Sequence, residues 1–486
     1  MKSHRESHVI CQDEGSSESV VKPTSGISRR SFLHLGAALG FAAVTIPRWS
    51  LAQIDSGLAY HYRLTAEPAQ AELVPGFKTD VLAFNGDIPA PVIRAKQGQP
   101  VRIEFTNNLD EPTTIHWHGL RIPIEMDGVP FLSQKPVMPG ETFIYEFTPP
   151  DAGTFWYHPH MNSVVQLGKG LVGAFIVEEA VKPDFDIDEV LILKHWHLDK
   201  KGGWKALTRP RYAARMGTPG EWGTANGINN PQRVYRPGSR VRLRLANVDN
   251  TMTYNLGLKG VNAQVIAIDG NPVLEPFTFD RHKIGPGMRL DLAFVMPDTA
   301  SGKGKVSLEY SLGKFGFPLA GFVPSSEPAL QAKPMPRLAM NPVPVPDLEQ
   351  AETLPFVFEW EGAISPVDEQ GKTHDTFWLI NRRPWQGMGP GNIPEPVADL
   401  TLGKSYIFDL KNNTQYHHPI HIHGHTFLVL ELDGKPVKPF YTDTVLLGKN
   451  GRAKAAFVAD NPGRWMYHCH VIEHMKTGLM GYVKVS

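Results

Sequence analysis

Cysteine is nearly absent from this chain of 486 residues, which contains only Cys11 and Cys469. If the N-terminal segment is removed, Cys469 has no partner for an intramolecular disulfide and is free for other chemistry. An excess of charge of either sign is also lacking, because 49 basic residues balance 49 acidic ones. A balanced chain without basic tracts gives no indication of nucleic acid as a partner. Low-complexity segments are absent as well.

Glycine and proline are plentiful, with 45 Gly and 42 Pro spread along the whole chain. Turn residues at such frequent intervals are typical of many short strands, so the composition predicts an all-β protein. The length and the 41% hydrophobic content are sufficient for two or three domains, each with its own core.

The N-terminus resembles a twin-arginine export leader. The segment Ser28-Arg29-Arg30-Ser31-Phe32-Leu33 precedes the apolar run 35–46, and a small-residue cleavage site follows near Ala52. The run is too short for a permanent membrane anchor. We therefore predict a signal peptide over 1–52, the twin-arginine translocase as a partner during export, and a periplasmic or secreted protein.

An internal repeat organises the remaining chain. Gly98 and Gly403 each open a segment with period-two alternation, and a histidine lies 18 residues after each glycine, at His116 and His421. The same spacing in a middle copy, which begins at Gly238, reaches Leu256 and no histidine. The first and third copies therefore retain metal-capable residues that the second copy lacks.

A second shared motif supports three domains. His158-Pro159-His160 in the first copy matches His468-Cys469-His470 in the third, five residues after a glycine in both cases, and the middle copy has no equivalent. A proline-rich stretch, 324–346, is typical of an extended connector. The phasing predicts domain 1 over 53–180, a domain 2 without metal over 181–345, and domain 3 over 346–486.

Histidines occur in four His-x-His pairs. Alternate residues of a strand share one face about 6.5 to 7 Å apart, so each pair can reach neighbouring metals. A single pair is more often an ordinary strand histidine, but four pairs in register between two repeats favour a metal cluster. The pairs are His116/His118, His158/His160, His421/His423 and His468/His470.

Three further residues form a second candidate set. If the chain around His468-Cys469-His470 is a strand, Cys469 points away from its two histidine neighbours. His418 lies three residues before His421 and so leaves that strand face, and His474 follows five residues after Cys469. Two imidazoles with one thiolate are typical of trigonal blue-copper electron-transfer sites.

These motifs resemble those of three-domain, laccase-like multicopper oxidases. The matching segments are His116-Trp117-His118-Gly119, 418–424 and 468–474, and the likeness covers essentially the whole mature chain. The resemblance implies three cupredoxin-like Greek-key β-sandwich domains. It also implies four copper ions, one of type 1, one of type 2 and two of type 3.

Carried over residue by residue, the resemblance implies a ligand set for each copper. Type 1 copper would be held by His418, Cys469 and His474. Type 2 copper would be held by His116 and His421. One type 3 copper would be held by His118, His158 and His470, and the other by His160, His423 and His468.

The implied activity is the oxidation of a small reducing substrate at type 1 copper, coupled to four-electron reduction of dioxygen to water at the trinuclear cluster. Phenols or aromatic amines are the predicted donors. The alternative is a metallo-oxidase for Cu(I), Fe(II) or Mn(II), and the absence of a methionine-rich insert among the 14 Met weakens it. A non-catalytic scaffold is disfavoured by the complete set of eleven ligands. Copper nitrite reductase is disfavoured because it does not need all eight cluster histidines.

The sequence departs from the family pattern at two positions. Leu479 stands where an axial methionine often binds, and Met480 should face the other way, which predicts a three-coordinate type 1 site of raised potential. Met475 replaces a glutamate that the family uses for proton delivery in several bacterial members. Asp127, which matches the acidic residue that the family places near the cluster, is the candidate proton relay, or else only a turn residue before Gly128.

Several residues lie outside the expected sites. His195 and His197 form a pair at the start of the copper-free domain, and we expect a structural or surface role for them. His417 and His425 flank expected ligands without the required spacing. Glu473 is placed either near the type 1 entrance or in solvent.

Overall fold

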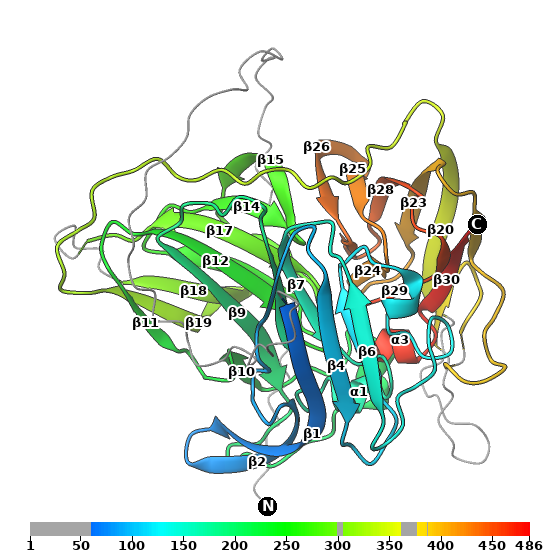
Figure 1. Cartoon of the computed structure of the whole chain (residues 1–486), viewed down its shortest axis with the longest axis horizontal. Coiled ribbons are helices and arrows are strands. Elements are labelled where there is room, and N and C mark those ends of the chain that lie inside the picture. The colour runs from blue at the N-terminus through cyan, green and yellow to red at the C-terminus, as the bar shows by residue number, and fades with distance from the viewer. Residues whose placement is uncertain (1–59, 299–304, 361–376, 386) are drawn as a thin grey trace, which may run out of the picture. The chain divides into compact units, whose positions relative to one another are not determined.

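The structure is a computed structural model that describes residues 60–298, 305–360, 377–385 and 387–486. The predicted signal peptide and Cys11 lie outside these residues. Strands dominate the described part, and its helices are single turns (Figure 1). Within the described ranges, no helix is both long enough and apolar enough to cross a membrane.

The first pair of sheets shows how the sequence pattern forms a strand. In β4 (Val101–Asn107) every second residue is buried, so Val101, Ile103 and Phe105 enter the core while the polar residues between them face outward. The first sheet of the pair has the order β2 (Phe77–Phe84), β1 (Tyr60–Val74), β4 and β6 (Thr142–Phe147). The second has the order β3 (Ile93–Lys96), β8 (Gly173–Glu178), β7 (Gly153–His158) and β5 (His116–His118).

The second pair is larger. One sheet has the order β10 (Trp222–Ala225), β9 (Ile187–Trp196), β12 (Arg240–Asn247), β17 (Arg289–Val295), β14 (Gln264–Ile268) and β15 (Asn271–Thr278). The other has the order β11 (Gln232–Tyr235), β19 (Phe315–Pro324), β18 (Val306–Leu312), β13 (Tyr254–Lys259) and β16 (His282–Ile284). Leu256 and Leu258 of β13, which stand at the repeat positions of the metal histidines, belong to its hydrophobic core.

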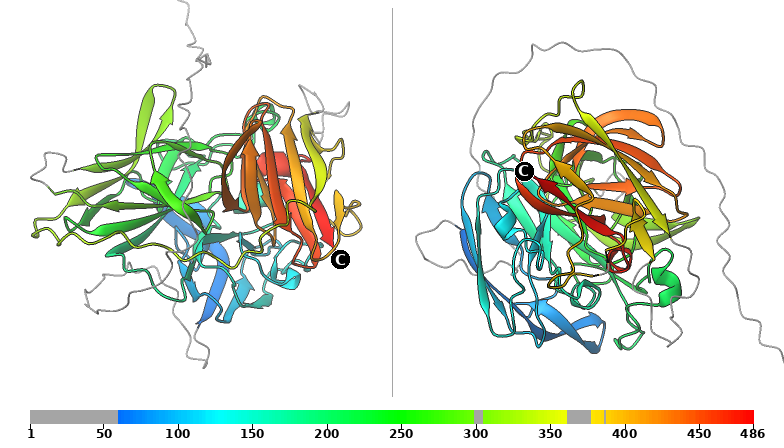
Figure 2. Two further views of the ribbon diagram at one scale, coloured as in Figure 1. Left: turned by 90° about the horizontal axis from the view of Figure 1, so that it is seen from above. Right: turned by 90° about the vertical axis from the view of Figure 1, so that its right-hand side faces the viewer.

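The third pair repeats this plan, and its orange and red strands can be followed in Figure 2. One sheet has the order β21 (Trp378–Ile380), β20 (Glu352–Trp360), β23 (Ser405–Asn412), β28 (Arg452–Val458), β25 (Phe427–Leu432) and β26 (Lys435–Thr442). The other has the order β22 (Ala398–Leu400), β30 (Met480–Val485), β29 (Gly463–Cys469), β24 (His418–Ile422) and β27 (Thr444–Leu447).

The three sheet pairs share one topology. The first strand of each pair runs parallel to a strand later in the chain, as β1 to β4, β9 to β12 and β20 to β23. The facing sheets repeat a second parallel pairing, β3 with β8, β11 with β19 and β22 with β30. Each pair encloses its own core. The prediction of an all-β fold of three cupredoxin-like sandwiches is confirmed.

Strand β12 departs from a simple inside and outside alternation because all eight of its residues are buried. Arg242 and Arg244 both donate to Asp291 of the neighbouring strand β17, and Arg244 also donates to Thr154 of the first sandwich at 3.0 Å. Thr154 of β7 in turn donates to Asp291 at 2.8 Å. The charged face of this strand is therefore an interface between sandwiches, and each guanidinium has carboxylate partners, as buried charge requires.

The connecting segments complete the description. Residues 325–347 form no regular element, in agreement with the extended connector that the prolines predict. The helical turns are η1 (Ile124–Met126), α1 (Ser163–Gln166), α2 (Pro210–Ala213) and α3 (Ile472–Lys476). Helix α3 and the turn η1 matter most for the site, because they carry or precede candidate ligands.

Gly128 closes the turn that begins with η1, and the structure predicts that it tolerates no side chain. Its φ is 82°, and an added Cβ would lie 1.8 Å from the carbonyl oxygen of Ile115. Gly128→Ala should therefore destabilise the protein by about 2 to 3 kcal/mol through strain and overpacking, and lower the midpoint of thermal unfolding by several degrees.

Gly98→Ala is the matched control. Gly98 has a similar φ of 73°, but no heavy atom lies within 4 Å of the added Cβ. This variant carries only the cost of the left-handed backbone, about 1 kcal/mol. Equal unfolding midpoints for the two variants would contradict the steric account.

Candidate metal centres

The thiolate candidate set forms a compact triangle. His418 begins β24, Cys469 ends β29, and His474 lies on α3. The Cys469 Sγ atom is 3.5 Å from His418 Nδ1 and 3.6 Å from His474 Nδ1, and the two Nδ1 atoms are 3.1 Å apart. The point equidistant from these three atoms is about 2 Å from each, which is the length of a metal–imidazole bond.

Burial controls the protonation of this triangle. All three side chains have 0% exposure. Burial lowers the pKa of His474 to about 3 and holds that of His418 well below its usual range, so both imidazoles are neutral and able to bind a metal. Burial also raises the pKa of the Cys469 thiol. A bound cation reverses this effect, because coordination favours the thiolate.

Second contacts orient the two imidazoles. His418 Nε2 lies 2.9 Å from the Thr414 hydroxyl, and His474 Nε2 donates to the Arg215 carbonyl at 2.7 Å. Each ring therefore turns its Nδ1 atom toward Cys469. At metal sites, a hydrogen bond to the second ring nitrogen usually fixes the orientation of the ligating imidazole in this way.

The indole of Trp378 packs against both rings of the triangle. Its ring centroid is 4.4 Å from that of His474 and 5.0 Å from that of His418.

Leu479 packs in the same hydrophobic cluster as Cys469, and its carbonyl accepts the Cys469 N–H at 3.0 Å. Met480 belongs to a different cluster. The two side chains thus face opposite ways, as the sequence predicted.

The eight paired histidines meet between the first and third sandwiches. His116 pairs with His158 across β5 and β7, and His421 pairs with His468 across β24 and β29. Across the interface, the rings of His116 and His423 stack at 3.8 Å, as do those of His118 and His421. The repeat in the sequence therefore becomes two equivalent histidine layers that face each other.

Within this cluster, three histidines at a time bring one nitrogen each within 4.8 Å of the others. The triplets include His118/His158/His470, His160/His423/His468 and His116/His118/His421. The first two triplets match the sets that the resemblance implied for the two type 3 coppers. The third contains both residues implied for type 2 copper.

Whether a metal fits the cluster can be judged from the imidazole nitrogen atoms that have no hydrogen-bond partner. The imidazoles are 0 to 2% exposed. A buried polar atom without a partner costs about 1 to 3 kcal/mol, so such atoms are rare in a finished fold. The nitrogen atoms that lack a hydrogen-bond partner are His116 Nε2, His118 Nδ1, His158 Nε2, both of His160, His421 Nε2 and both of His470. One nitrogen of each of these rings is therefore free to bind a metal ion, and the donor set fits copper.

The protonation state of the cluster imidazoles also agrees with metal binding. Neutral imidazole is the form that binds metal. Burial is the largest influence on each ring whose pKa shifts, and the pKa falls for His118, His158, His160, His421, His423, His468 and His470.

Two buried aspartates hold the cluster imidazoles. Asp127 lies directly after η1, its carboxylate is 2.9 Å from His423 Nδ1, and its carbonyl is 2.8 Å from His116 Nδ1. Asp443 mirrors it, with its carbonyl 3.0 Å from His421 Nδ1 and a carboxylate oxygen 3.2 Å from His118 Nε2. Asp127 is therefore more than a turn residue.

Asp443 was not predicted, because no motif marks Thr442-Asp443-Thr444 in the sequence. It depends on Arg289, a buried residue of β17 in the second sandwich that donates to both carboxylate oxygens, at 2.9 and 2.5 Å. Burial raises the pKa of Asp443, but the Arg289 charge and hydrogen bonds outweigh it and hold the net pKa below its usual range. The middle domain thus contributes to the cluster through an ion pair.

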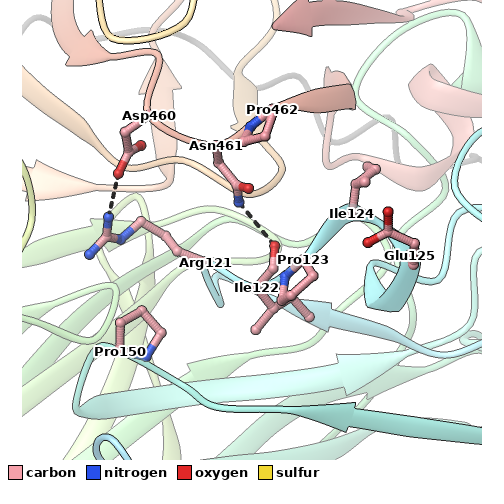
Figure 3. A pocket seen from close by; sticks show the side chains of 9 residues that line it. All are labelled: Arg121, Ile122, Pro123, Ile124, Glu125, Pro150, Asp460, Asn461 and Pro462. Carbon is pink, nitrogen blue, oxygen red and sulfur yellow. Dashed lines mark hydrogen bonds and ion pairs between the residues drawn. The ribbon is translucent and has the colours of Figure 1, made fainter. Parts of the chain in front are cut away.

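A surface cavity of about 350 Å³ is lined in part by Ile124 and Glu125 of the η1 turn, which directly precedes Asp127 (Figure 3). At this place the first and third sandwiches are joined by Arg121 and Asp460 at 2.9 Å, and by Asn461 and the Ile122 carbonyl at 2.9 Å. Glu125 lines the same cavity.

The histidines expected outside the sites have other partners. His195 lies between the hydroxyls of Tyr254 and Tyr310, at 2.8 and 3.2 Å, and His197 Nε2 donates to the Thr218 carbonyl at 2.9 Å. Both are buried, so the surface alternative is wrong and the structural role stays the prediction.

His417 and His425 join none of the triplets described above. His425 is buried, and its Nδ1 donates to the His423 carbonyl at 3.2 Å.

For Glu473, the solvent alternative is wrong. Its carboxylate is 2% exposed and accepts the backbone N–H and the hydroxyl of Thr218, the latter at 2.8 Å.

Three β-sandwiches with a buried thiolate–imidazole triangle and an eight-histidine cluster define a copper-dependent redox protein. Models of the multicopper oxidase family match residues 65–182, 188–303 and 366–486. A multicopper oxidase structure from Pseudomonas thermotolerans is 45% identical with a TM-score of 0.80, covering 88% of this chain and 99% of that one. Another from Pseudomonas parafulva is 44% identical with a TM-score of 0.78, covering 88% and 100%.

Multicopper oxidase MmcO of Mycobacterium tuberculosis is 30% identical, over 93% of this chain and 95% of its own length. The chain belongs to the multicopper oxidase family. It is therefore an oxidoreductase that depends on copper and uses dioxygen to oxidise a reducing substrate or metal ion.

The Arg289–Asp443 pair generates a stability prediction. Arg289→Leu leaves a buried carboxylate without its charged partner, which should cost about 3 to 5 kcal/mol and lower the unfolding midpoint of the copper-free protein in urea. The exposed pair of Arg452 and Asp409 has a similar two-bond geometry and provides the control, because Arg452→Leu should change the midpoint little. Equal effects of the two substitutions would contradict a buried, structural role for Arg289.

Proposed function

We propose that this chain is a four-copper, laccase-like oxidase. The ligands are His418, Cys469 and His474 for type 1 copper, His116 and His421 for type 2, and the triplets His118/His158/His470 and His160/His423/His468 for type 3. When bound, copper supplies one-electron oxidation of the donor at the type 1 site and four-electron reduction of dioxygen to two waters at the cluster. The observation that carries the proposal is the set of buried, partnerless imidazole nitrogens beside the thiolate triangle.

The protein's own part is to hold and connect the two centres. Cys469 belongs to the triangle, and its chain neighbours His468 and His470 belong to two different triplets of the cluster. Only peptide bonds separate these three residues. The burial of every ligand excludes bulk water, which strengthens electrostatic interactions and limits side reactions.

Asp127 is the proposed proton relay, since Met475 cannot carry a proton. Its carboxylate touches His423 in the cluster, and the η1 turn that leads to it forms part of the wall of the surface cavity with Glu125. A carboxylate in this place can take a proton from the cavity side and hold it beside the cluster, while it keeps the His423 ring oriented.

Phenols or aromatic amines are the proposed donors. Similar proteins carry names of both candidate kinds: Laccase-1 of Botryotinia fuckeliana is 28% identical, and a Campylobacter jejuni multicopper oxidase described as a metallo-oxidase is 25% identical. Residues 208–218, which lie next to the type 1 triangle, contain three arginines, one methionine and no acidic residue. Such a surface favours organic donors over Cu(I), Fe(II) or Mn(II).

We further propose export as a folded protein to the periplasm or the medium by the twin-arginine translocase, with removal of 1–52. The support is the Arg29-Arg30 motif and its apolar run. The proposed domains are 53–180, 181–345 and 346–486. The strands of the three sheet pairs fall inside these ranges, which supports the division.

Oxygen uptake by the copper-loaded protein tests the function. A phenol and an aromatic amine should support uptake with a higher kcat/KM than Cu(I) or Fe(II). Cys469→Ser should lose the blue colour, one copper per chain and all donor oxidation, because the thiolate belongs to the type 1 set.

His195→Gln provides the control, because it replaces a buried histidine outside both centres and should keep the colour and the copper content. Donor oxidation that persists in Cys469→Ser would refute electron entry at this site. Faster turnover with a metal ion than with either organic donor would favour the metallo-oxidase.

The position of Leu479 generates a second prediction. Leu479→Met should lower the reduction potential of the blue centre, because a thioether on that side of Cys469 can act as a weak axial ligand. Met480→Leu, on the opposite face, should leave the potential unchanged. A redox titration of the two variants measures this, and the absence of any shift in Leu479→Met would count against the predicted axial position.

A further inference from the structure

A segment of the second domain covers the type 1 histidine. We call residues 208–218, which include α2, the basic cap. The cap lies against the triangle because its Arg215 carbonyl accepts the His474 Nε2–H at 2.7 Å and its Ala213 carbonyl accepts the Trp378 indole N–H at 3.1 Å. Ala214 belongs to the core of the third sandwich. His474 consequently has no exposed surface.

The far end of the basic cap is fixed as well. Thr218 donates its N–H and hydroxyl to Glu473, the residue before His474, and its carbonyl accepts a hydrogen bond from His197. Gly217 is packed so closely that an added Cβ would lie 2.6 Å from Thr251 and 3.0 Å from Val471. A donor therefore meets the outer side of the cap, and not the imidazole itself.

The outer side of the cap is positive. Arg209, Arg211, Tyr212, Arg215 and Met216 are all exposed. Arg209 lies 3.8 Å from Glu221, which also pairs with Lys205. Within the described ranges, Arg211 and Arg215 have no ion-pair partner. The segment that covers His474 thus exposes two guanidinium groups without an ion-pair partner, together with an aromatic ring and a thioether.

We propose that the basic cap selects electron donors that combine an aromatic ring with a negative charge, such as phenols that bear a carboxylate, and that Arg211 and Arg215 determine this specificity. Guanidinium groups pair with carboxylates, while Tyr212 and Met216 offer an apolar contact to the ring. The proposal rests on the proposed oxidase function and names its substrate class. Each donor loses one electron and its phenolic proton and becomes a phenoxyl radical. Dioxygen takes up the electrons and protons of four donors and forms two waters.

A matched pair of donors tests the proposal. Syringate and dimethoxyphenol share one phenol ring, and only syringate carries a carboxylate. In Arg211→Gln/Arg215→Gln, the KM for syringate should rise about fivefold at an ionic strength of about 10 mM, where the Debye length is about 30 Å. The KM for dimethoxyphenol and both kcat values should stay within about twofold. At about 1 M salt the difference should disappear.

Binding provides a second readout that needs no turnover. Trimethoxybenzoate has no phenolic proton to lose, and its Kd by calorimetry should weaken in the double variant. Lys404 directly precedes β23 and Lys411 lies within it, in the sheet of the third sandwich that does not contain Cys469. Lys404→Gln/Lys411→Gln removes these two exposed positive charges and should change neither KM nor Kd.

Three outcomes would overturn the proposal: an unchanged KM for syringate, an equal rise for both donors, or the same loss in the lysine control. Failure of the unmodified enzyme to oxidise dimethoxyphenol would instead refute the proposed function, so the two failures are distinguishable.

Discussion

Side chains alternate across a β-strand, and this molecule depends on that constraint at the end of β29. His468 and Cys469 are neighbours in the chain, yet one ring faces the histidine cluster and the thiol faces the opposite side. His470 continues the alternation just beyond the strand. Two centres of different chemistry are therefore held a few covalent bonds apart, and neither can move without the other.

The cluster itself requires two sandwiches. Each contributes four imidazoles from a pair of antiparallel strands and the residues just beyond their ends, and two pairs of facing rings stack across the interface. The middle sandwich has Leu256 and Leu258 at two of the equivalent positions, but it contributes in two other ways. Arg289 fixes Asp443 beneath the cluster, and the basic cap closes over His474. A domain without ligands thus supports both centres.

The local and periodic features of the molecule could be predicted from the sequence. Repeated glycine-to-histidine spacings identified the paired histidines, and strand alternation separated Cys469 from them, because both depend only on residues close in the chain. Asp443 and Arg289 could not be found in this way, since 154 residues separate them and no spacing marks either. The same applies to Glu473, whose partner Thr218 is 255 residues away. The burial of Arg242 and Arg244 in β12 depends likewise on residues distant in the chain, Glu179 and Thr154.

Anomalous X-ray scattering at the copper edge, from crystals of the copper-loaded protein, tests the central claim most directly. The account predicts one copper between His418, Cys469 and His474, and three among the eight paired histidines, each bonded to the residues proposed for it. A peak absent from the thiolate triangle, or fewer than three in the histidine cluster, would contradict the account.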